Sequence, residues 1–334
     1  MINFRFHIVS LTAVLLALGI GLVLGTTFLD DALEQTLKKQ LNDLEASLSD
    51  SRARNDELTR QLKAYQEEAA ALDDQLGERL YPGQLSNDPV LVVTTKGVDK
   101  KWVDETMQVL GQANAQVLGT WWLTDRLNLD DDEKVSDLAK ALELTTDDGD
   151  RLRRSFAEQM GDVLFGPTDT AAGAVAPGRA EPPLVARLRA AGFLDYQMPD
   201  GADGDTVQLP TAGLRVVVVD GPGAQVAPDQ IVEPLLSRLA EDGPVPVVAV
   251  QPLPEPEDEQ AKNEEPPPTP LVEDIRDDGK LKDRLSTVDD FDRVAGHAAL
   301  VLAAVDARPG TPEVGHYGAT DGADRLLPPA PGDK

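Results

Sequence analysis

An uncharged stretch near the N-terminus limits most strongly what this chain can become. Residues 8–29 read IVSLTAVLLALGIGLVLGTTFL. At a helical rise of about 1.5 Å per residue, this segment can span the hydrocarbon core of a bilayer, about 30 Å thick. It is longer than the apolar region of about 7–15 residues found in cleaved signal peptides. We therefore expect an uncleaved transmembrane anchor, with signal cleavage near residues 23–25 as the alternative.

The charges that flank this segment predict its orientation. Arg5 and the α-amino group precede it, and Asp30 and Asp31 follow it. Positive charge is retained on the cytoplasmic side of a membrane helix. The sequence thus predicts a single-pass protein of the cell membrane, with residues 1–7 cytoplasmic and the bulk of the chain extracytoplasmic.

A heptad repeat begins directly after the predicted anchor. Apolar residues recur at the first and fourth heptad positions through residues 31–80, which is typical of a long helix in a coiled-coil stalk. The expected interface consists of Leu37, Leu41, Leu44, Leu48, Asn55, Leu58, Leu62, Tyr65, Leu72 and Leu76.

The polar residue Asn55 in this seam favours one register and one oligomeric state. Two copies anchored at their N-termini in one membrane must run parallel, so the pattern predicts a parallel homodimer or a coiled coil with a different envelope protein. The alternative is a single amphipathic helix that folds onto its own globular domain or onto another protein.

Residues 86–320 alternate between short apolar runs and helical patterns. Val/Leu/Ile-rich strands separated by helices indicate an α/β fold with a parallel, Rossmann-like sheet covered on both faces. The expected strands are 89–95, 115–123, 214–220 and 244–250. The expected helices are 102–113, 132–144, 149–166, 183–192, 228–242 and 291–306.

Two further segments lack the apolar residues that a core requires. Residues 252–270 read PLPEPEDEQAKNEEPPPTP, and residues 321–334 are similar in composition. Acidic, proline-rich segments of this kind do not bury a core. We therefore expect a disordered insertion in the α/β domain and a disordered C-terminal tail.

Charge and composition exclude several classes of function. The net charge of −28 disfavours nucleic acid as a partner, because phosphate binding requires clustered lysine and arginine. Cysteine is absent, which excludes disulfides, thiolate metal sites and cysteine nucleophiles. The chain has only three histidines, and none belongs to a recognisable catalytic arrangement. We do not expect an enzyme or a tightly bound cofactor.

A glycine-containing turn after the expected strand 214–220 invites comparison with nucleotide-binding turns. It reads Asp220-Gly-Pro-Gly223. The third glycine of the dinucleotide fingerprint is missing, and Pro222 lacks the backbone N–H that a phosphate would need. The pattern therefore predicts a tight turn without a nucleotide.

Two motifs near the C-terminus are the best candidates for a site. The first, 286–292, reads STVDDFD before the last expected helix. Thr287 can cap that helix and the aspartates suit its dipole, and the alternative is a small acidic site. The second, 315–318, reads GHYG, where His316 is a group able to bind metal and sense pH.

The opening HIVSLTAVLLALGIGLVLGTTF and the C-terminal LSTVDDFDRVAGHAALVLAAV with GHYG resemble the mycobacterial copper-transport MctB family. The resemblance implies copper transport or homeostasis in an actinobacterial envelope, and the family has been described as an outer-membrane channel. Similar proteins include SteB, a partner in cell separation, which implies a scaffold in envelope growth or cell division as the alternative role.

The same resemblance implies which residues form the site. It points to His316 as the metal ligand, with copper as the possible bound ion. The motif residues carried over are Ser286, Thr287, Asp289, Asp290, Gly315, His316, Tyr317 and Gly318.

Overall fold

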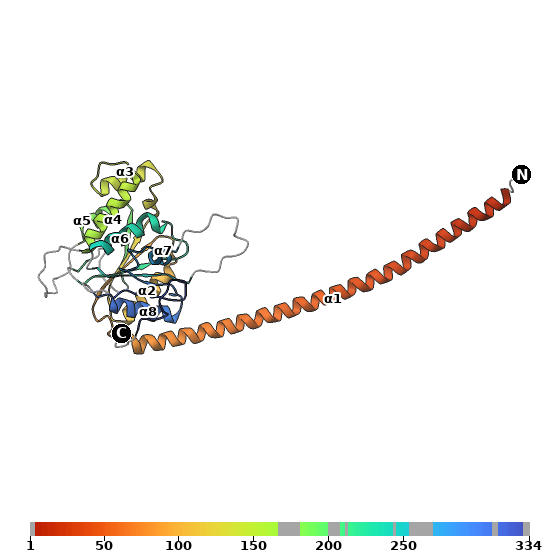
Figure 1. The fold of residues 1–334 in the computed structure, drawn as a ribbon, viewed down its shortest axis with the longest axis horizontal. Coiled ribbons are helices and arrows are strands. Elements are labelled where there is room, and N and C mark those ends of the chain that lie inside the picture. Colours follow the sequence, from red (N-terminus) through yellow and green to blue (C-terminus); the bar gives the residue numbers. More distant parts are fainter. Residues whose placement is uncertain are drawn as a thin grey trace. The chain divides into compact units, whose positions relative to one another are not determined.

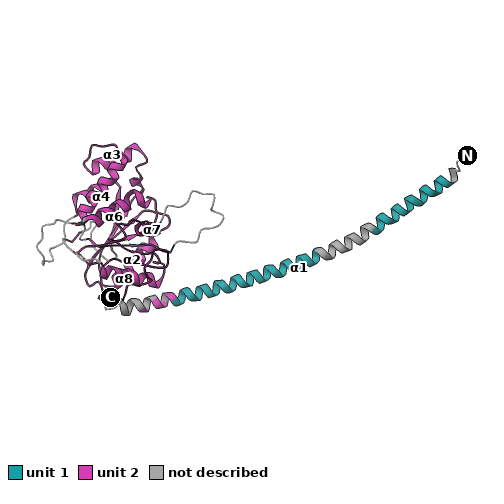
Figure 2. Cartoon of the chain, viewed as in Figure 1, with its two compact units in different colours: residues 1–68 teal, residues 69–334 magenta. Residues whose placement is uncertain are grey.

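The computed structural model describes residues 4–165, 181–199, 208–210, 213–242, 245–253, 270–308 and 313–329. It divides into two compact units, residues 1–68 and 69–334 (Figure 2). The predicted insertion falls almost entirely on residues 254–269, which lie outside the described residues, as do residues 330–334 of the predicted tail.

The first unit belongs to one helix, α1 (Phe4–Leu80), which is unbroken over 77 residues (Figure 1). It contains the stretch Phe6–Leu24, with a mean hydropathy of 2.4, which is long and apolar enough to cross a membrane. The helix ends before Tyr81-Pro82-Gly83, because proline cannot continue it. It runs through the predicted boundary between anchor and stalk without a break, so that boundary stays a prediction.

The predicted seam lies along one helix whose apolar side chains face solvent. Leu44 is 67% exposed, Leu62 is 58% exposed and Tyr65 is 70% exposed. The helix α1 by itself therefore leaves about half or more of each of these side chains exposed.

The second unit is built on a seven-stranded sheet in the order β3-β2-β1-β4-β5-β6-β7. All neighbouring strands are parallel except β2 and β3, which are antiparallel. The strands are β1 (Pro89–Thr95), β2 (Gln116–Leu123), β3 (Leu194–Gln197), β4 (Arg215–Val219), β5 (Val247–Val250), β6 (Ser286–Val288) and β7 (His316–Tyr317).

Helices cover both faces of this sheet. Alternate residues of a strand point to opposite faces, so Leu91 of β1 enters one core cluster and Val92 enters the other. The first cluster packs against α3 (Asp132–Ala141), α4 (Gly149–Phe165), α5 (Pro183–Ala190), α6 (Pro228–Asp242) and α7 (Leu271–Asp277). The second packs against α2 (Lys100–Gln112) and α8 (Val294–Asp306).

The α/β class, the long N-terminal helix and the mostly parallel sheet are confirmed. Only β3 departs from the parallel pattern, because it runs antiparallel at one edge. The short elements β3, β6, β7 and α7 escaped prediction, because strands of two to four residues and a helix of seven carry too little periodicity to recognise.

The glycine turn after β4 has a packing role. Its Gly223 lies against Gly97, the turn that follows β1, and a Cβ on Gly97 would lie only 1.9 Å from the Gly223 carbonyl oxygen. Gln225 N–H also donates to the Lys96 carbonyl at 2.7 Å. These contacts close the crevice between β1 and β4, where doubly wound sheets usually bind nucleotides.

Candidate functional site

The two C-terminal motifs become neighbours through strand pairing. β6 carries Ser286–Val288 and β7 carries His316–Tyr317, with Thr287 opposite His316. The backbone continues this pairing, since Asp289 N–H donates to the Tyr317 carbonyl at 3.2 Å. Two segments separated by the whole of α8 therefore form one edge of the sheet.

This placement overturns the interpretation of Thr287 as a helix cap. Thr287 lies inside β6, whereas α8 begins only at Val294 and its N-cap residue, Arg293, makes no side-chain cap hydrogen bond. The three-residue strand β6 precedes α8, and it contains the residues 286–288 that the sequence pattern had assigned to the start of the helix.

Arg276, on α7, is the centre of the buried polar network. It is only 4% exposed and forms an ion pair with Asp289, which is fully buried. Its Nε donates to Thr287 Oγ1 at 3.0 Å, and its Nη2 donates to the Tyr317 carbonyl at 3.0 Å. One guanidinium thus joins α7, β6 and β7, as its rigid set of five donors allows.

Asp289 is matched by donors on every side. Its Oδ1 accepts from Ala319 N–H at 2.7 Å, and its Oδ2 accepts from the Thr320 hydroxyl at 2.6 Å. Burial alone acts to raise the pKa of Asp289, but hydrogen bonds from Thr320, Ala319 and Arg276 outweigh it and hold that pKa below its usual value. Asp289 is therefore a stable carboxylate.

Both ring nitrogens of His316 are engaged. Nε2 lies 3.0 Å from the Lys282 carbonyl, which can only accept, so Nε2 carries the proton. Nδ1 lies 2.9 Å from Thr287 Oγ1 and accepts the hydroxyl proton, because in a neutral ring whose Nε2 carries the proton Nδ1 can only accept. Burial is the main cause that lowers the pKa of His316, which favours this neutral form.

The glycines of the GHYG motif make room for side chains of the network. A Cβ on Gly318 would lie 2.1 Å from Asp289 Oδ1, and Gly318 also has a φ of +134° that disfavours other residues. A Cβ on Gly315 would lie 2.1 Å from the Tyr317 hydroxyl oxygen. Glycine is thus required at both positions, because a side chain would clash with Asp289 or with the Tyr317 hydroxyl.

The carboxyl group of Asp290 lies in an environment opposite to that of Asp289. It is fully buried, and neither carboxylate oxygen has a hydrogen-bond partner among the described residues. Burial, and next the negative charge of Asp289, raise the pKa of Asp290 to about 6. The backbone of Asp290 is pressed against Gly296, where a Cβ would lie 2.2 Å from the Asp290 carbonyl oxygen.

Sequence reasoning missed the two partners that hold the site together. Arg276 and Thr320 stand in segments with no strong periodicity, and α7 is too short to predict. The only signal was a lone arginine among the acidic residues of LVEDIRDD, which a buried carboxylate requires as a partner.

The chemistry of this network is limited by its burial. A hydroxyl hydrogen-bonded to an imidazole is a feature of nucleophilic sites, but Thr287 is fully buried and its oxygen is held by Arg276. Within the described ranges, no group of three or more His, Asp or Glu side chains could hold a metal ion. The arrangement ties the C-terminal segment to the sheet.

Fold and site together describe a class of protein. It has an N-terminal apolar helix able to cross a membrane, a long heptad helix, and an α/β unit closed by a buried Arg–Asp–His network.

The family model described as "Copper transport outer membrane protein, MctB" matches residues 1–328, and the chain belongs to this family. Proteins named "Copper transporter MctB" from Mycobacterium tuberculosis and Mycobacterium bovis are each 29% identical over 334 residues, covering 97% of this chain and 98% of the relative. The Mycobacterium leprae protein of that name is 27% identical over 339 residues, covering 98% and 100%.

Proposed function

We propose that this chain serves copper transport or copper homeostasis as a non-enzymatic, membrane-anchored protein. The observation that carries the proposal is the full-length family match, because it includes the apolar helix, the heptad helix and both C-terminal motifs. Copper is here the cargo. The names of the relatives, which are 29% identical to this chain, support the role.

The proposed topology places the N-terminus in the cytoplasm and the α/β unit outside the membrane. Arg5 before the apolar stretch and Asp30 and Asp31 after it support this orientation. The 19-residue span Phe6–Leu24 supports anchoring by a single helix.

The experiment for this function compares cells with and without the gene. Deletion is expected to change both the copper content of the cells and their growth at graded copper concentrations, and the full chain is expected to restore both. A version without the apolar stretch is expected not to restore them. Unchanged copper content and copper tolerance in the deletion strain would contradict the proposal.

A direct contact with copper is proposed at His316, the metal-competent residue of the GHYG motif. Because Nε2 donates to the Lys282 carbonyl and Nδ1 accepts from Thr287, binding there requires one of these bonds to open. Copper titration of the full chain against a competing chelator, beside His316→Gln, tests this contact. Equal binding by both proteins would remove His316 from the copper path.

A second candidate function is a scaffold that binds a partner protein in envelope growth or cell separation. The exposed apolar seam favours it, since eight seam side chains face solvent in the single chain: Leu37, Leu41, Leu44, Leu48, Leu58, Leu62, Tyr65 and Leu72. We propose that a second copy, or a heptad-bearing envelope protein, covers this seam in parallel. A deletion strain with normal copper handling but chained, unseparated cells would favour this role.

A further inference from the structure

A hollow at the β3 side of the sheet lies apart from the motif network and has no role in the proposed function. It has a volume of about 660 Å³, within the range of pockets that bind small molecules. It lies toward the carboxyl ends of β1 and β2, the edge at which open α/β sheets bind ligands. Gly97 and Gly223 close the usual crevice between β1 and β4, and this hollow lies instead at the β3 edge of the sheet.

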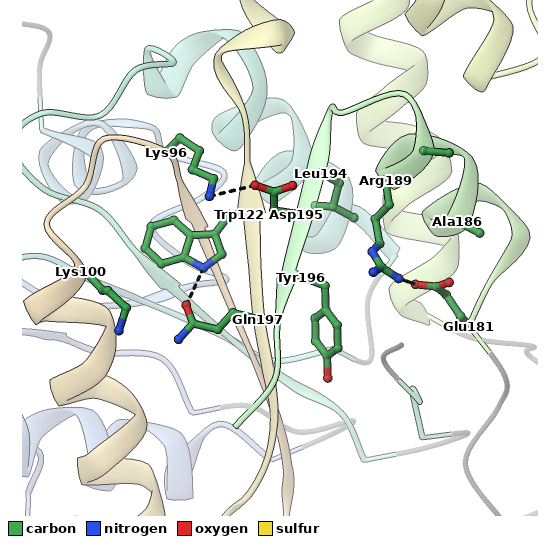
Figure 3. A pocket seen from close by; sticks show the side chains of 11 residues that line it. Lys96, Lys100, Trp122, Glu181, Ala186, Arg189, Leu194, Asp195, Tyr196 and Gln197 are labelled. Carbon is green, nitrogen blue, oxygen red and sulfur yellow. Dashed lines mark hydrogen bonds and ion pairs between the residues drawn. The ribbon is translucent and has the colours of Figure 1, made fainter. Parts of the chain in front are cut away.

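Polar groups in this hollow are already held in place (Figure 3). Trp122 Nε1 donates to Gln197 Oε1 at 3.2 Å, which fixes the amide and leaves its NH₂ group without a partner among the described residues. The Lys96 ammonium lies 5.1 Å from the centre of the Trp122 ring and 2.9 Å from Asp195. These donors are oriented before any ligand arrives, which lowers the entropic cost of binding.

A third donor can be recruited at low cost. Lys100 begins α2 and pairs with Asp104 at 2.7 Å, but their side chains are 61% and 48% exposed. An ion pair so open to water contributes little, so the ammonium can turn to a new partner. Lys100 and Gln197 also line an adjoining hollow of about 620 Å³ along α2, so both stand where the two hollows meet.

The other side of the hollow is lined by α5 and β3. Ala186, Ala190 and the Tyr196 ring give it apolar surface, whereas the side chain of Leu194 is buried in the core. Arg189 closes its rim, held by Glu181 at 2.6 Å. A ligand that fills the hollow thus meets ammonium and amide donors beside the Asp195 carboxylate on one side of β3. On the other side it meets the alanine and tyrosine surface beside the Arg189–Glu181 ion pair (Figure 3).

We propose that this hollow binds a small amphiphilic anion, a carboxylate attached to an apolar body. The carboxylate is received by Lys100 and the Gln197 amide beside Lys96, and the apolar body rests against the α5 side. The net charge of −28 repels anions over the surface as a whole. Recognition therefore depends on these local donors.

The test uses 2-naphthoate as the probe and its uncharged counterpart 2-naphthamide, titrated calorimetrically into the full chain in detergent. We expect saturable binding of one naphthoate per chain and affinity about tenfold lower for the amide, the effect of a contact of about 1.4 kcal/mol. Lys100→Gln and Gln197→Leu are each expected to weaken naphthoate binding about tenfold.

Lys63→Gln, which removes an exposed lysine of α1, is the matched control and is expected to bind naphthoate like the parent chain. Equal affinity for acid and amide, unchanged binding in both hollow variants, or no saturable binding below about 1 mM would each overturn the proposal.

Discussion

The apolar side chains of the heptad helix and of the sheet lie in opposite environments. Leu44 and Leu62 of α1 are 67% and 58% exposed, whereas Leu91 and Val92 of β1 are fully buried. The sheet gathers its core from strands far apart in the chain, so it completes that core within one copy. The seam is a local repeat on one helix, so it can be covered only by another surface.

The free energy gained by burying the seam side chains shows how large this difference is. Full burial of a leucine-sized side chain contributes about 1.5–3 kcal/mol, so covering eight of them is worth on the order of 10 kcal/mol per helix. That exceeds what propensity alone gives an isolated helix in water. The contrast therefore predicts that the two regions respond separately to mutation.

The largest expected effect is in the α/β unit. Arg276→Ala leaves the Asp289 carboxylate buried without its cation, and breaking such a pair is expected to cost about 3–5 kcal/mol. Urea unfolding followed by tryptophan fluorescence measures this loss, because all three tryptophans lie in the second unit.

The far-ultraviolet signal of the heptad helix is expected to survive this change. Loss of both signals at one urea concentration would show that the regions unfold together, contrary to the comparison. Lys140→Ala, at an exposed pair on α3, is the control and is expected to be near neutral.

The second-largest expected effect is a stabilisation, and it concerns the carboxyl group of Asp290. The pKa of Asp290, raised to about 6 from 3.8, means that the folded state binds more protons than the unfolded state between these values. Stability therefore falls as pH rises through this window. Asp290→Asn is expected to stabilise the protein by about 1–2 kcal/mol at pH 7.5 and by nothing near pH 3.5.

Asp289→Asn serves as the matched comparison, since it changes the adjacent residue in the same way. It is expected to destabilise at pH 7.5, because Asp289 is a satisfied carboxylate with a lowered pKa. Its partners lose charge-assisted hydrogen bonds. If both variants changed stability in the same direction, the contrast between the two aspartates would be wrong.

The smallest expected effect is the titration of His316. Its pKa is lowered by burial, so the unfolded state takes up a proton first as pH falls below 6.5. The stability contributed by the neutral ring is present above that pH and is lost as the solution becomes more acidic. The free energy of unfolding is measured at pH 7.5 and 5.5 in two variants, Asp290→Asn and the double variant Asp290→Asn/His316→Gln. The Asp290→Asn change removes the opposing titration of Asp290 from both.

The sequence was sufficient where structure follows a local period. The apolar stretch and heptad pattern predicted α1, and strands such as 89–95 were apparent from continuous valine and leucine. The candidate site was only half predictable. Its motif residues could be named, but the pairing of β6 with β7 and the role of Arg276 depend on contacts between distant segments, for which one sequence carries no signal.

The most direct test of the account is disulfide cross-linking of the seam. Because the chain contains no cysteine, an introduced cysteine is the only one able to form a disulfide. Ser51 takes the fourth heptad position between Leu44 and Leu58, and Ala53 lies on the outer face of the same turn. In a parallel, in-register pair, two copies of Ser51→Cys come within disulfide distance, whereas two copies of Ala53→Cys do not. Full-length variants are oxidised mildly in native membranes and resolved on non-reducing gels.

The account predicts a cross-linked dimer from Ser51→Cys and little or none from Ala53→Cys. Equal cross-linking at both positions, or none at Ser51, would contradict a parallel pairing of two copies through this seam. The search for its partner would then turn to a different protein.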